Sequence, residues 1–279
     1  MAEGRYLLGV TPPADAQAFL APQGAAIPPG ELGRLGLLAA TRRRRRLLPE
    51  RLWEPLPEAF SGHIAAVAAR PLFKGIYDGA RTSFGAVPPA HLIPVQPQVD
   101  FTFAASTAAR AATEEAALAL CLPAAAESIA AWGHVSQDPG GPSFVVVSPD
   151  LNLKVTEMRL LNGDALRLAV TVSKTAVFVC AVECRGRLYL KDGTHRAVGL
   201  ADRGAPYIPA VILHADGDDS LIPRHLTDEA LFGDAPPSVV DFVTPGLYIS
   251  HPWQPLMKVI RLRPDAFTVP SQAGMDPVV

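Results

Sequence analysis

Three adjacent side chains that can bind an anion, Thr194, His195 and Arg196, follow an Asp-Gly pair in the last third of the chain. Their hydroxyl, imidazole and guanidinium groups can all donate hydrogen bonds to phosphate or carboxylate oxygens. We expect these residues to begin a helix, where the first main-chain amides have no partner within the helix and carry a partial positive charge. Residue type and position together therefore predict an anion-binding turn.

This turn needs a strand before it, and a helix and a second strand after it. Residues 187–190 are mostly apolar and predict a short strand, which Asp192-Gly193 ends. Residues 194–202 can form a helix, Arg203-Gly204 stops it, and residues 208–213 predict the second strand. The anion-binding turn would lie at the carboxyl end of a strand, where α/β folds usually place ligands.

A series of β-rich runs precedes this unit. Two hairpin signals join the runs: Asn162-Gly163-Asp164, and Cys184-Arg185-Gly186-Arg187, which leads into the strand over residues 187–190. The pattern predicts a sheet that ends at the anion-binding turn. The runs are Phe144–Val147, Lys154–Leu161, Leu166–Val172 and Ala176–Val182.

The rest of the chain predicts helices and short strands joined by proline-rich connections. The 28 prolines favour long extended connections and argue against a helix-only architecture. Alanine stripes along residues 107–120 predict close-packed helix faces, and the glycine- and aromatic-rich stretch 71–81 is either a pocket lining or a packed connection. The expected helices cover residues 31–41, 58–69, 107–120, 124–132 and 227–232, and the expected strands cover residues 6–10, 99–103, 239–243, 246–250 and 257–262.

Composition favours a soluble globular protein. The 279 residues are 49% apolar and 19% charged, which suits a packed core. A formal net charge of −2 argues against a generally basic nucleic-acid coat protein, although a local basic patch could still bind DNA. The sequence has no secretory signal and no apolar run of the ~20 residues that a membrane helix needs, so we expect a cytoplasmic protein without membrane contact.

Neither the cysteines nor the acidic residues have the spacing of a metal site. Cys121, Cys180 and Cys184 are too few and too irregularly spaced for a disulfide framework. Cys180 and Cys184 would face the same side of a strand, but no further ligands lie nearby, so we expect reduced thiols in or near a core. Asp216-Gly217-Asp218-Asp219 lacks the glutamate and the spacing of an EF-hand, and we interpret it as a solvated turn. We assign no metal ligands from spacing.

Five consecutive arginines, Arg42 to Arg46, allow two interpretations. They could bind the phosphates of nucleic acid or of a nucleotide. They could instead form a solvated helix end, where cations favour the C-terminal dipole and balance acidic residues such as Glu50, Glu54 and Glu58. The absence of interleaved aromatic residues favours the helix end. Because five like charges repel one another, we expect a counter-charged partner within the protein or outside it.

The turn and its closing strand carry a family resemblance. The segment Leu190-Lys191-Asp192-Gly193-Thr194-His195-Arg196 is followed by Ile208-Pro209-Ala210-Val211-Ile212. This order resembles the ParB/sulfiredoxin-like superfamily, whose members share a strand, a Gly-x-His-Arg type turn, a helix, and a strand with a Val/Ile-Pro-Val/Ala-Val pattern. The resemblance covers about residues 150–214, and the runs 153–161 and 176–182 lie about where the preceding strands of that fold would be.

The resemblance implies a nucleotide or phosphate pocket at the turn. Gly193 would permit a close backbone approach, and His195 and Arg196 would contact phosphate oxygens together with the helix amides. Asp192 would orient His195, cap the helix, or hold a magnesium ion through water. Thr194 stands where sulfiredoxins have a cysteine, which argues against thiol-based repair, and no helix-turn-helix follows, which argues against centromere-type DNA binding. Alternatively, the motif is an ordinary strand–turn–helix with Asp192 as a cap and with His195 and Arg196 solvated.

Residues and resemblance together predict an α+β protein with a mixed β-sheet and flanking helices. Residues 1–95 would form an N-terminal helical and proline-rich extension. Residues 96–215 would form the ParB/sulfiredoxin-like core, and residues 216–279 a C-terminal extension that packs on it.

The expected function is binding of ATP or CTP with Mg²⁺, or of another phosphorylated ligand, at Gly193, Thr194, His195 and Arg196. An enzyme of this kind would be a nucleotide hydrolase, a phosphotransferase or a nuclease, with Asp192 and His195 as catalytic groups. Glu183 and Asp202 are further candidate bases. The alternatives are a non-enzymatic nucleic-acid-associated regulatory or accessory protein that uses the arginine run, and a structural component of an assembly.

Overall fold

The computed structural model divides the chain into two compact units. Unit 1 comprises residues 1–127 and 176–255, and unit 2 comprises residues 128–175 and 256–279. The expected boundary near residue 95 lies inside unit 1, and the segment expected as the core is divided between the two units. The structure describes residues 2–44, 51–125, 131–138, 141–148, 153–161, 167–174, 177–217, 222, 225–254 and 257–263.

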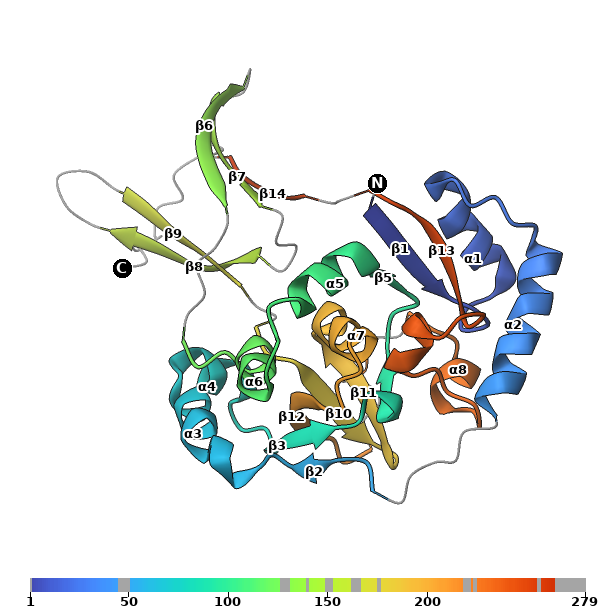
Figure 1. The fold of residues 1–279 in the computed structure, drawn as a ribbon. Coiled ribbons are helices and arrows are strands. Elements are labelled where there is room, and N and C mark those ends of the chain that lie inside the picture. Colours follow the sequence, from blue (N-terminus) through green and yellow to red (C-terminus); the bar gives the residue numbers. More distant parts are fainter. Residues whose placement is uncertain are drawn as a thin grey trace, which may run out of the picture. The chain divides into compact units, whose positions relative to one another are not determined.

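Unit 1 is built around a six-stranded mixed sheet, so the chain is a mixed α/β protein (Figure 1). In spatial order the strands are β2 (Glu54–Pro55), β3 (Thr82–Val87), β12 (Ile208–His214), β10 (Cys180–Cys184), β11 (Arg187–Asp192) and β4 (Leu92–Pro94). β10 is parallel to β12 and β11 is parallel to β4, whereas the other neighbours are antiparallel. β10 and β12 are apolar except for Glu183 and His214 and bury nearly every other side chain, as is typical of strands covered on both faces.

The elements around the predicted anion-binding turn are those expected from the sequence. β11 is followed by α7 (Thr194–Asp202), Gly204 takes a φ of +75° just beyond the helix, and β12 follows. β10 and β11 form an antiparallel hairpin whose two-residue loop, Arg185-Gly186, has φ values of 50° and 69°. Positive φ at both positions is what a twisted two-residue hairpin loop requires. The predicted strand–turn–helix–strand unit and its hairpin are confirmed.

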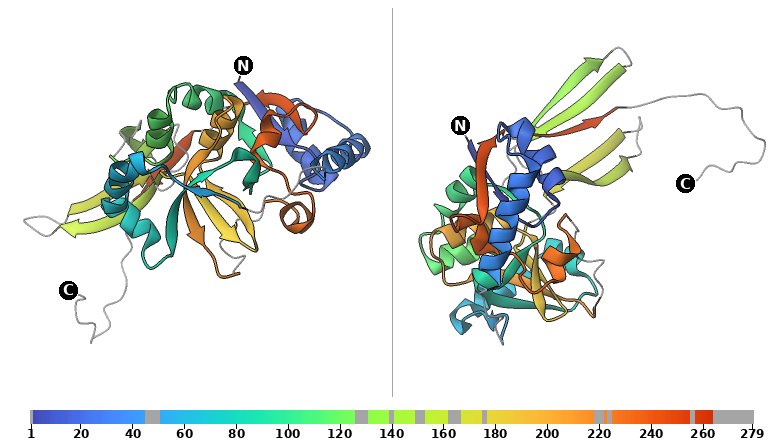
Figure 2. Two further views of the ribbon diagram at one scale, coloured as in Figure 1. Left: turned by 60° about the horizontal axis from the view of Figure 1, so that its bottom comes forward. Right: turned by 90° about the vertical axis from the view of Figure 1, so that its right-hand side faces the viewer.

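Helices α5 (Phe101–Ala108) and α7 pack against each other (Figures 1 and 2). Their contact depends on small residues, because a Cβ on Gly199 would lie 2.8 Å from the Cβ of Ala108. Ala104 and Ala108 are fully buried. Of the alanines in the predicted stripe along residues 107–120, Ala108 is thus packed closely against another helix.

The expected helix over residues 107–120 is instead two helices, α5 and α6 (Glu114–Cys121). Asp100 accepts a hydrogen bond from the Phe103 amide and Thr113 accepts one from the Ala116 amide, so each side chain caps a separate helix start. The expected strand over residues 99–103 is shortened for the same reason.

A second, three-stranded sheet of unit 1 joins the two ends of that unit. Its antiparallel strands are β13 (Tyr248–Trp253), β1 (Ala2–Leu7) and β5 (Gln98–Asp100), and it packs with α1 (Pro13–Leu20) and α2 (Pro29–Arg43). The stretch 71–81, expected as a loop, contains a helix, and the strand expected over residues 239–243 is a 3-10 helix. The remaining helical elements are α3 (Ser61–Ala69), α4 (Pro71–Tyr77), α8 (Asp228–Phe232) and 3-10 turns at Ala21–Gln23, Glu58–Phe60, Pro89–His91 and Val239–Val243.

Unit 2 consists of two small antiparallel sheets. One has the order β14 (Lys258–Leu262), β7 (Gly141–Ser148), β6 (Trp132–Asp138), and the other pairs β8 (Leu153–Leu161) with β9 (Arg167–Lys174). The expectation that the run 153–161 belongs to the core sheet is wrong. β8 leaves its side chains from Lys154 to Leu161 exposed, whereas a strand of the six-stranded sheet must present apolar side chains to a covering layer.

Two sequence expectations fall partly or wholly outside the described residues. The helix expected over residues 124–132 spans residues 126–130, which are not described, and Trp132 begins β6. The hairpin signal at residues 162–164 is also not described, although the strands on either side of it, β8 and β9, do pair antiparallel.

Candidate functional site

Gly193 makes the turn between β11 and α7. Its φ is +90°, a left-handed conformation that glycine adopts without the strain a side chain would bring. A Cβ at this position would lie 2.7 Å from Val179 Cγ2 and 3.0 Å from Val179 Cα. Glycine is therefore required here by the backbone conformation and by the close approach of Val179, independently of any ligand.

The N-cap residue of α7 is Gly193, which has no side chain with which to cap the helix. The N-cap position is therefore not taken by Asp192. Side chains of the N-cap residues cap α5, α6 and α8, whereas those of α1, α2, α3 and α4 do not cap their helices. Thr194 is buried and its neighbours in the turn are half-buried. The first-turn amides of α7 are thus the groups that an anion would meet at this end of the helix.

The imidazole of His195 has a partner within the fold. Its Nε2 accepts a hydrogen bond from the Asp100 amide at 3.3 Å, and Phe103 packs edge-on against the ring at 5.2 Å between centroids. Burial lowers the pKa of His195, the charge of Arg196 lowers it further, and Asp100 offsets part of this effect. The ring is held neutral with its proton on Nδ1. The alternative of a solvated His195 is not observed.

Arg196 also bonds to the main chain. Its Nη1 donates to the carbonyl oxygen of Leu120 at 3.3 Å and to that of Val177. Leu120 lies at the end of α6, and Val177 leads into β10. Arg196 therefore joins the two segments at which the chain leaves unit 1 and returns to it, and it is half-buried rather than solvated.

The segment at which the chain leaves unit 1 is anchored at successive carbonyls. The Cys121 carbonyl accepts a hydrogen bond from the Val179 amide at 2.9 Å, and the Leu122 carbonyl accepts one from His63 Nε2 at 2.7 Å. The Pro123 carbonyl accepts one from Arg70. With the Arg196 bond, four consecutive carbonyls are held by four different residues, which fixes the position of this segment.

Asp192 ends β11, opposite the first residue of β10, and is half-buried. Burial raises the pKa of the nearby Tyr77 hydroxyl, and the charge of Asp192 raises it further. Burial likewise raises the pKa of Cys180, to about 11, with Asp192 again adding to the effect. Asp192 thus lies near two groups whose pKa is raised, while Arg196 and Lys191 act on the same groups in the opposite direction.

Arg43 is a buried structural residue, contrary to both interpretations of the arginine run. Its Nε donates to Asp241 Oδ2 at 2.6 Å and its Nη1 donates to the Leu8 carbonyl at 2.8 Å. The side chains of Arg43 and Asp241 are 1% and 0% exposed. The counter-charged partner expected for the run is therefore provided, for this arginine, inside the protein.

The other arginines of the run differ from Arg43. Arg42 is exposed and donates to the Pro245 carbonyl at 3.2 Å, and Arg44 is exposed. Residues 45–46 lie outside the described residues. The end of α2 is thus part buried ion pair and part solvated helix end.

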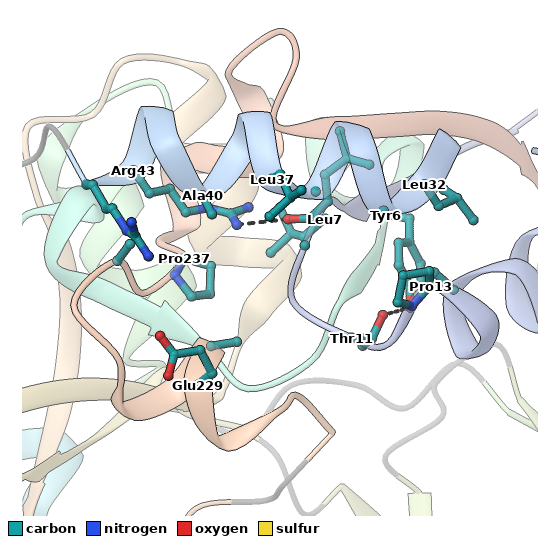
Figure 3. A pocket seen from close by; sticks show the side chains of 18 residues that line it. Tyr6, Leu7, Thr11, Pro13, Leu32, Leu37, Ala40, Arg43, Glu229 and Pro237 are labelled. Atoms are coloured by element: carbon teal, nitrogen blue, oxygen red, sulfur yellow. Dashed lines mark hydrogen bonds between the residues drawn. The ribbon is translucent and has the colours of Figure 1, made fainter. Parts of the chain in front are cut away.

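Two cavities lie in unit 1, away from the turn. One, of about 290 Å³, lies between α2, the end of β1 and α8, and is lined by Arg43 among others (Figure 3). The other, of about 490 Å³, lies between α1 and residues 96–98. Neither is lined by residues 192–196. The sequence therefore did not point to either cavity, and the turn itself is not part of them.

A hydrogen-bonded polar group that the sequence did not predict lies elsewhere on the six-stranded sheet. Ser83 Oγ lies 2.9 Å from His214 Nε2, and His214 Nδ1 lies 3.0 Å from Glu183 Oε2. The indole of Trp53 donates to the same carboxylate oxygen at 3.2 Å. These residues belong to β3, β12, β10 and the segment before β2.

Part of this group could have been found from the sequence. Glu183 and His214 are polar residues near the carboxyl ends of two apolar strands, but only Glu183 was considered, as a candidate base. Ser83 gave no signal, because it is 131 residues from His214 and only the folded sheet brings them together. The other candidate base, Asp202, ends α7 at the far end of the helix from the turn.

Among the described residues, no group of three or more His, Cys, Asp or Glu side chains could hold a metal ion. The three cysteines are buried thiols outside any disulfide, as expected, and burial raises the pKa of Cys121 to about 12. No helix in the described part of the chain is long and apolar enough to cross a bilayer.

Comparison of the chain with protein-family models, with curated proteins and with solved structures found no match. What the protein does must therefore be argued from the geometry of the chain itself.

Proposed function

We propose that the protein binds a phosphorylated ligand at the amino end of α7, with the triphosphate of ATP or CTP and its Mg²⁺ as the expected form. The observation that carries the proposal is the first turn of α7, whose N-cap is a left-handed glycine at the end of β11. A helix amino end of this kind stabilises an anion by about 0.3–1 kcal/mol at an exposed surface and by up to ~2 kcal/mol when partly buried.

Charge near the turn adds to this effect. Arg196 stays cationic whatever carbonyl it bonds, and its position is fixed by two main-chain acceptors. His195 Nε2 accepts the hydrogen bond of the Asp100 amide, and burial lowers the pKa of the ring, so its expected contribution is hydrogen bonding rather than charge. The ligand would be held mainly by amides of the first turn of α7 and by the charge of Arg196.

The order of elements supports a ParB/sulfiredoxin-like core as the framework of the site. The strand, the Gly193 turn, α7 and the Ile208–His214 strand follow one another as in the motif of that superfamily. In this proposal the core consists of β10, β11, α7 and β12, without the run 153–161.

Phosphoryl transfer or hydrolysis is the reaction that such a site would favour, because this chemistry needs mainly positioning and neutralisation of phosphate charge. Asp192 is the candidate for holding the magnesium ion through water. One carboxylate suffices for this role, since Mg²⁺ in nucleotide sites is usually bound by one or two carboxylates together with the phosphates. Asp192 and His195 stay the proposed catalytic groups, in a nucleotide hydrolase, a phosphotransferase or a nuclease.

A panel of nucleotides with magnesium, tested by thermal shift and calorimetry, examines the proposal. A ligand at ~100 times its dissociation constant should stabilise the protein by ~2.7 kcal/mol. Arg196→Gln keeps a donor for the carbonyls but removes the charge, and it should weaken binding by about tenfold, or ~1.4 kcal/mol. Arg196→Lys keeps the charge and is the matched variant. Lys74→Gln, at an exposed position of α4, controls for a general loss of positive charge.

Each variant is compared with and without ligand, so that a change in its own stability does not enter the result. Asp192→Asn should remove the dependence of binding on magnesium. The proposal fails if no nucleotide shifts the wild-type protein, or if the two Arg196 variants respond equally. The buried Arg43 does not favour nucleic-acid binding by the arginine run, and affinity that falls steeply with added salt would be the sign of such binding.

A further inference from the structure

The residues Ser83, His214 and Glu183 are aligned by the register of three neighbouring strands. Ser83 on β3 pairs with Ile212 on β12, two residues before His214, so both polar side chains lie on one face of the sheet. Glu183 on β10 lies directly beside His214 in the parallel pair. The side-chain alignment is thus built into the sheet and does not depend on a loop.

Main-chain hydrogen bonds hold the end of β12 where His214 lies. The His214 amide donates to the Arg81 carbonyl at 3.0 Å, and the Ala215 amide donates to the Glu183 carbonyl at 3.0 Å. Both bonds extend the sheet to the carboxyl end of β12. The imidazole is therefore carried by ordered backbone on both sides.

The hydrogen bonds determine which nitrogen of the His214 imidazole donates and which accepts. A carboxylate oxygen can only accept, so His214 Nδ1 donates its proton to Glu183 Oε2. In the neutral ring Nε2 then carries a lone pair, which accepts the hydroxyl proton of Ser83. This is the arrangement in which an imidazole can remove the proton of a serine nucleophile while a carboxylate stabilises the imidazolium that forms.

Trp53 positions the carboxylate. Its indole Nε1 donates to Glu183 Oε2, the oxygen that also accepts from His214, and its ring lies 6.1 Å from the imidazole between centroids. The indole packs over Gly85, where a Cβ would lie 2.8 Å from Trp53 Cε3. Glycine at this point of β3 therefore gives the indole the space it needs.

The group is open to solvent on one side. The side chains of His214 and Glu183 are 27% and 33% exposed, and Ser83 is half-buried. Arg81, which precedes β3, forms an exposed ion pair with Asp216.

We propose that Ser83, His214 and Glu183 form a nucleophilic site that cleaves carboxylic esters. Ser83 Oγ attacks the ester carbonyl carbon while its proton passes to His214 Nε2. The C–O bond to the alcohol then breaks, and His214 returns the proton to the leaving oxygen. Water, deprotonated by the same imidazole, releases the acid from the acyl-serine and restores the hydroxyl.

This site is separate from the proposed phosphate site. Asp192 pairs with Cys180, the first residue of β10, whereas Glu183 is the fourth residue of that strand. Three residues along a strand correspond to about 10 Å. Loss of one activity can therefore be observed without loss of the other.

The test is labelling of the full chain with a fluorophosphonate, which forms a phosphonate ester with an activated serine and releases fluoride. Peptide mass spectrometry should find the label on Ser83, and hydrolysis of p-nitrophenyl acetate should stop in the labelled protein. Ser250 is the internal control, because its hydroxyl donates to a carboxylate, Glu3 Oε1 at 2.9 Å, with no imidazole in this bond.

Variants separate the roles of the residues. Ser83→Ala and His214→Asn should lose labelling and ester hydrolysis, whereas Ser250→Ala should retain both. Glu183→Gln should slow labelling by at least about 100-fold while Ser83 stays the labelled residue, as expected for a positioning role. The proposal is overturned if Ser83 in the wild-type protein is labelled no faster than Ser250, a comparison that needs no variant to fold, or if folded His214→Asn is labelled at the wild-type rate.

Discussion

Replacing Arg43 with methionine should destabilise unit 1 by about 3–5 kcal/mol. The Arg43 guanidinium donates to Asp241 at 2.6 Å and to the Leu8 carbonyl at 2.8 Å, with both ion-pair side chains at most 1% exposed. Methionine keeps the apolar stem but takes the guanidinium from a buried carboxylate, and a buried charge that loses its partner costs more than the intact pair contributes. With a urea slope of about 2–3 kcal/mol/M, the unfolding midpoint should fall by about 1–2.5 M.

Urea denaturation followed by tryptophan fluorescence and circular dichroism measures this loss. A double-mutant cycle with Asp241→Asn isolates the pair: the double variant should be at least ~2 kcal/mol more stable than the sum of the single effects predicts. Arg42→Met is the matched control, because Arg42 bonds a carbonyl from an exposed position, and its effect should stay below about 1 kcal/mol. Equally small effects of the Arg42 and Arg43 substitutions on stability would refute the reasoning. The whole arginine run would then be interpreted as a solvated or ligand-binding cluster.

Gly199→Ala should lower the free energy of unfolding by about 1–3 kcal/mol in thermal melts, because the new methyl group would meet Ala108 of α5. Gly62→Ala in α3, with nothing within 4 Å of the new methyl group, should be neutral or stabilising. Equal effects of the two substitutions would contradict the packing argument. Burial raises the pKa of Cys121 to about 12 and that of Cys180 to about 11, so both thiols should react with iodoacetamide at pH 8 only as fast as the protein opens. Rapid labelling of the native protein would show instead that the thiols are accessible. Because burial lowers the pKa of His195, the unfolded ring binds protons more readily than the folded one, so stability should fall as the pH drops below 6.5. His195→Gln should flatten this part of the stability profile, and parallel profiles for variant and wild type would argue against the assignment.

The sequence predicts the local unit around the turn because its signals are adjacent in the chain. Apolar residues 187–190, Gly193 and Gly204 each determine a conformation within a few residues, and the observed β11, α7 and β12 follow them. Arg43 shows the limit of this reasoning: its partner Asp241 is 198 residues away, so five adjacent arginines appeared as one cluster although one of them is buried.

Strand pairing has the same limit. β8 has the β-rich composition of a core strand, yet among the described strands it pairs with β9 alone. Within its own residues, only the charged residues between the apolar ones indicate an exposed two-stranded ribbon rather than a strand of the core sheet. β3, which supplies Ser83, joins the sheet from the half of the chain where no strand was expected at that position. A site made by three strands was therefore not predictable from any one of them.

The side chains that mark the turn for ligand binding also hold the fold together, which constrains how a ligand can be bound. Gly193 is fitted to Val179, His195 to the Asp100 amide, and Arg196 to two carbonyls. Side chains fixed in this way cannot reorient around a phosphate without breaking contacts of unit 1. Main-chain amides at the start of α7 need no such movement, because the helix already directs them outward. A phosphoryl group should thus be recognised by amide geometry and by the charge of Arg196, and substitutions that keep that charge should affect stability more than affinity.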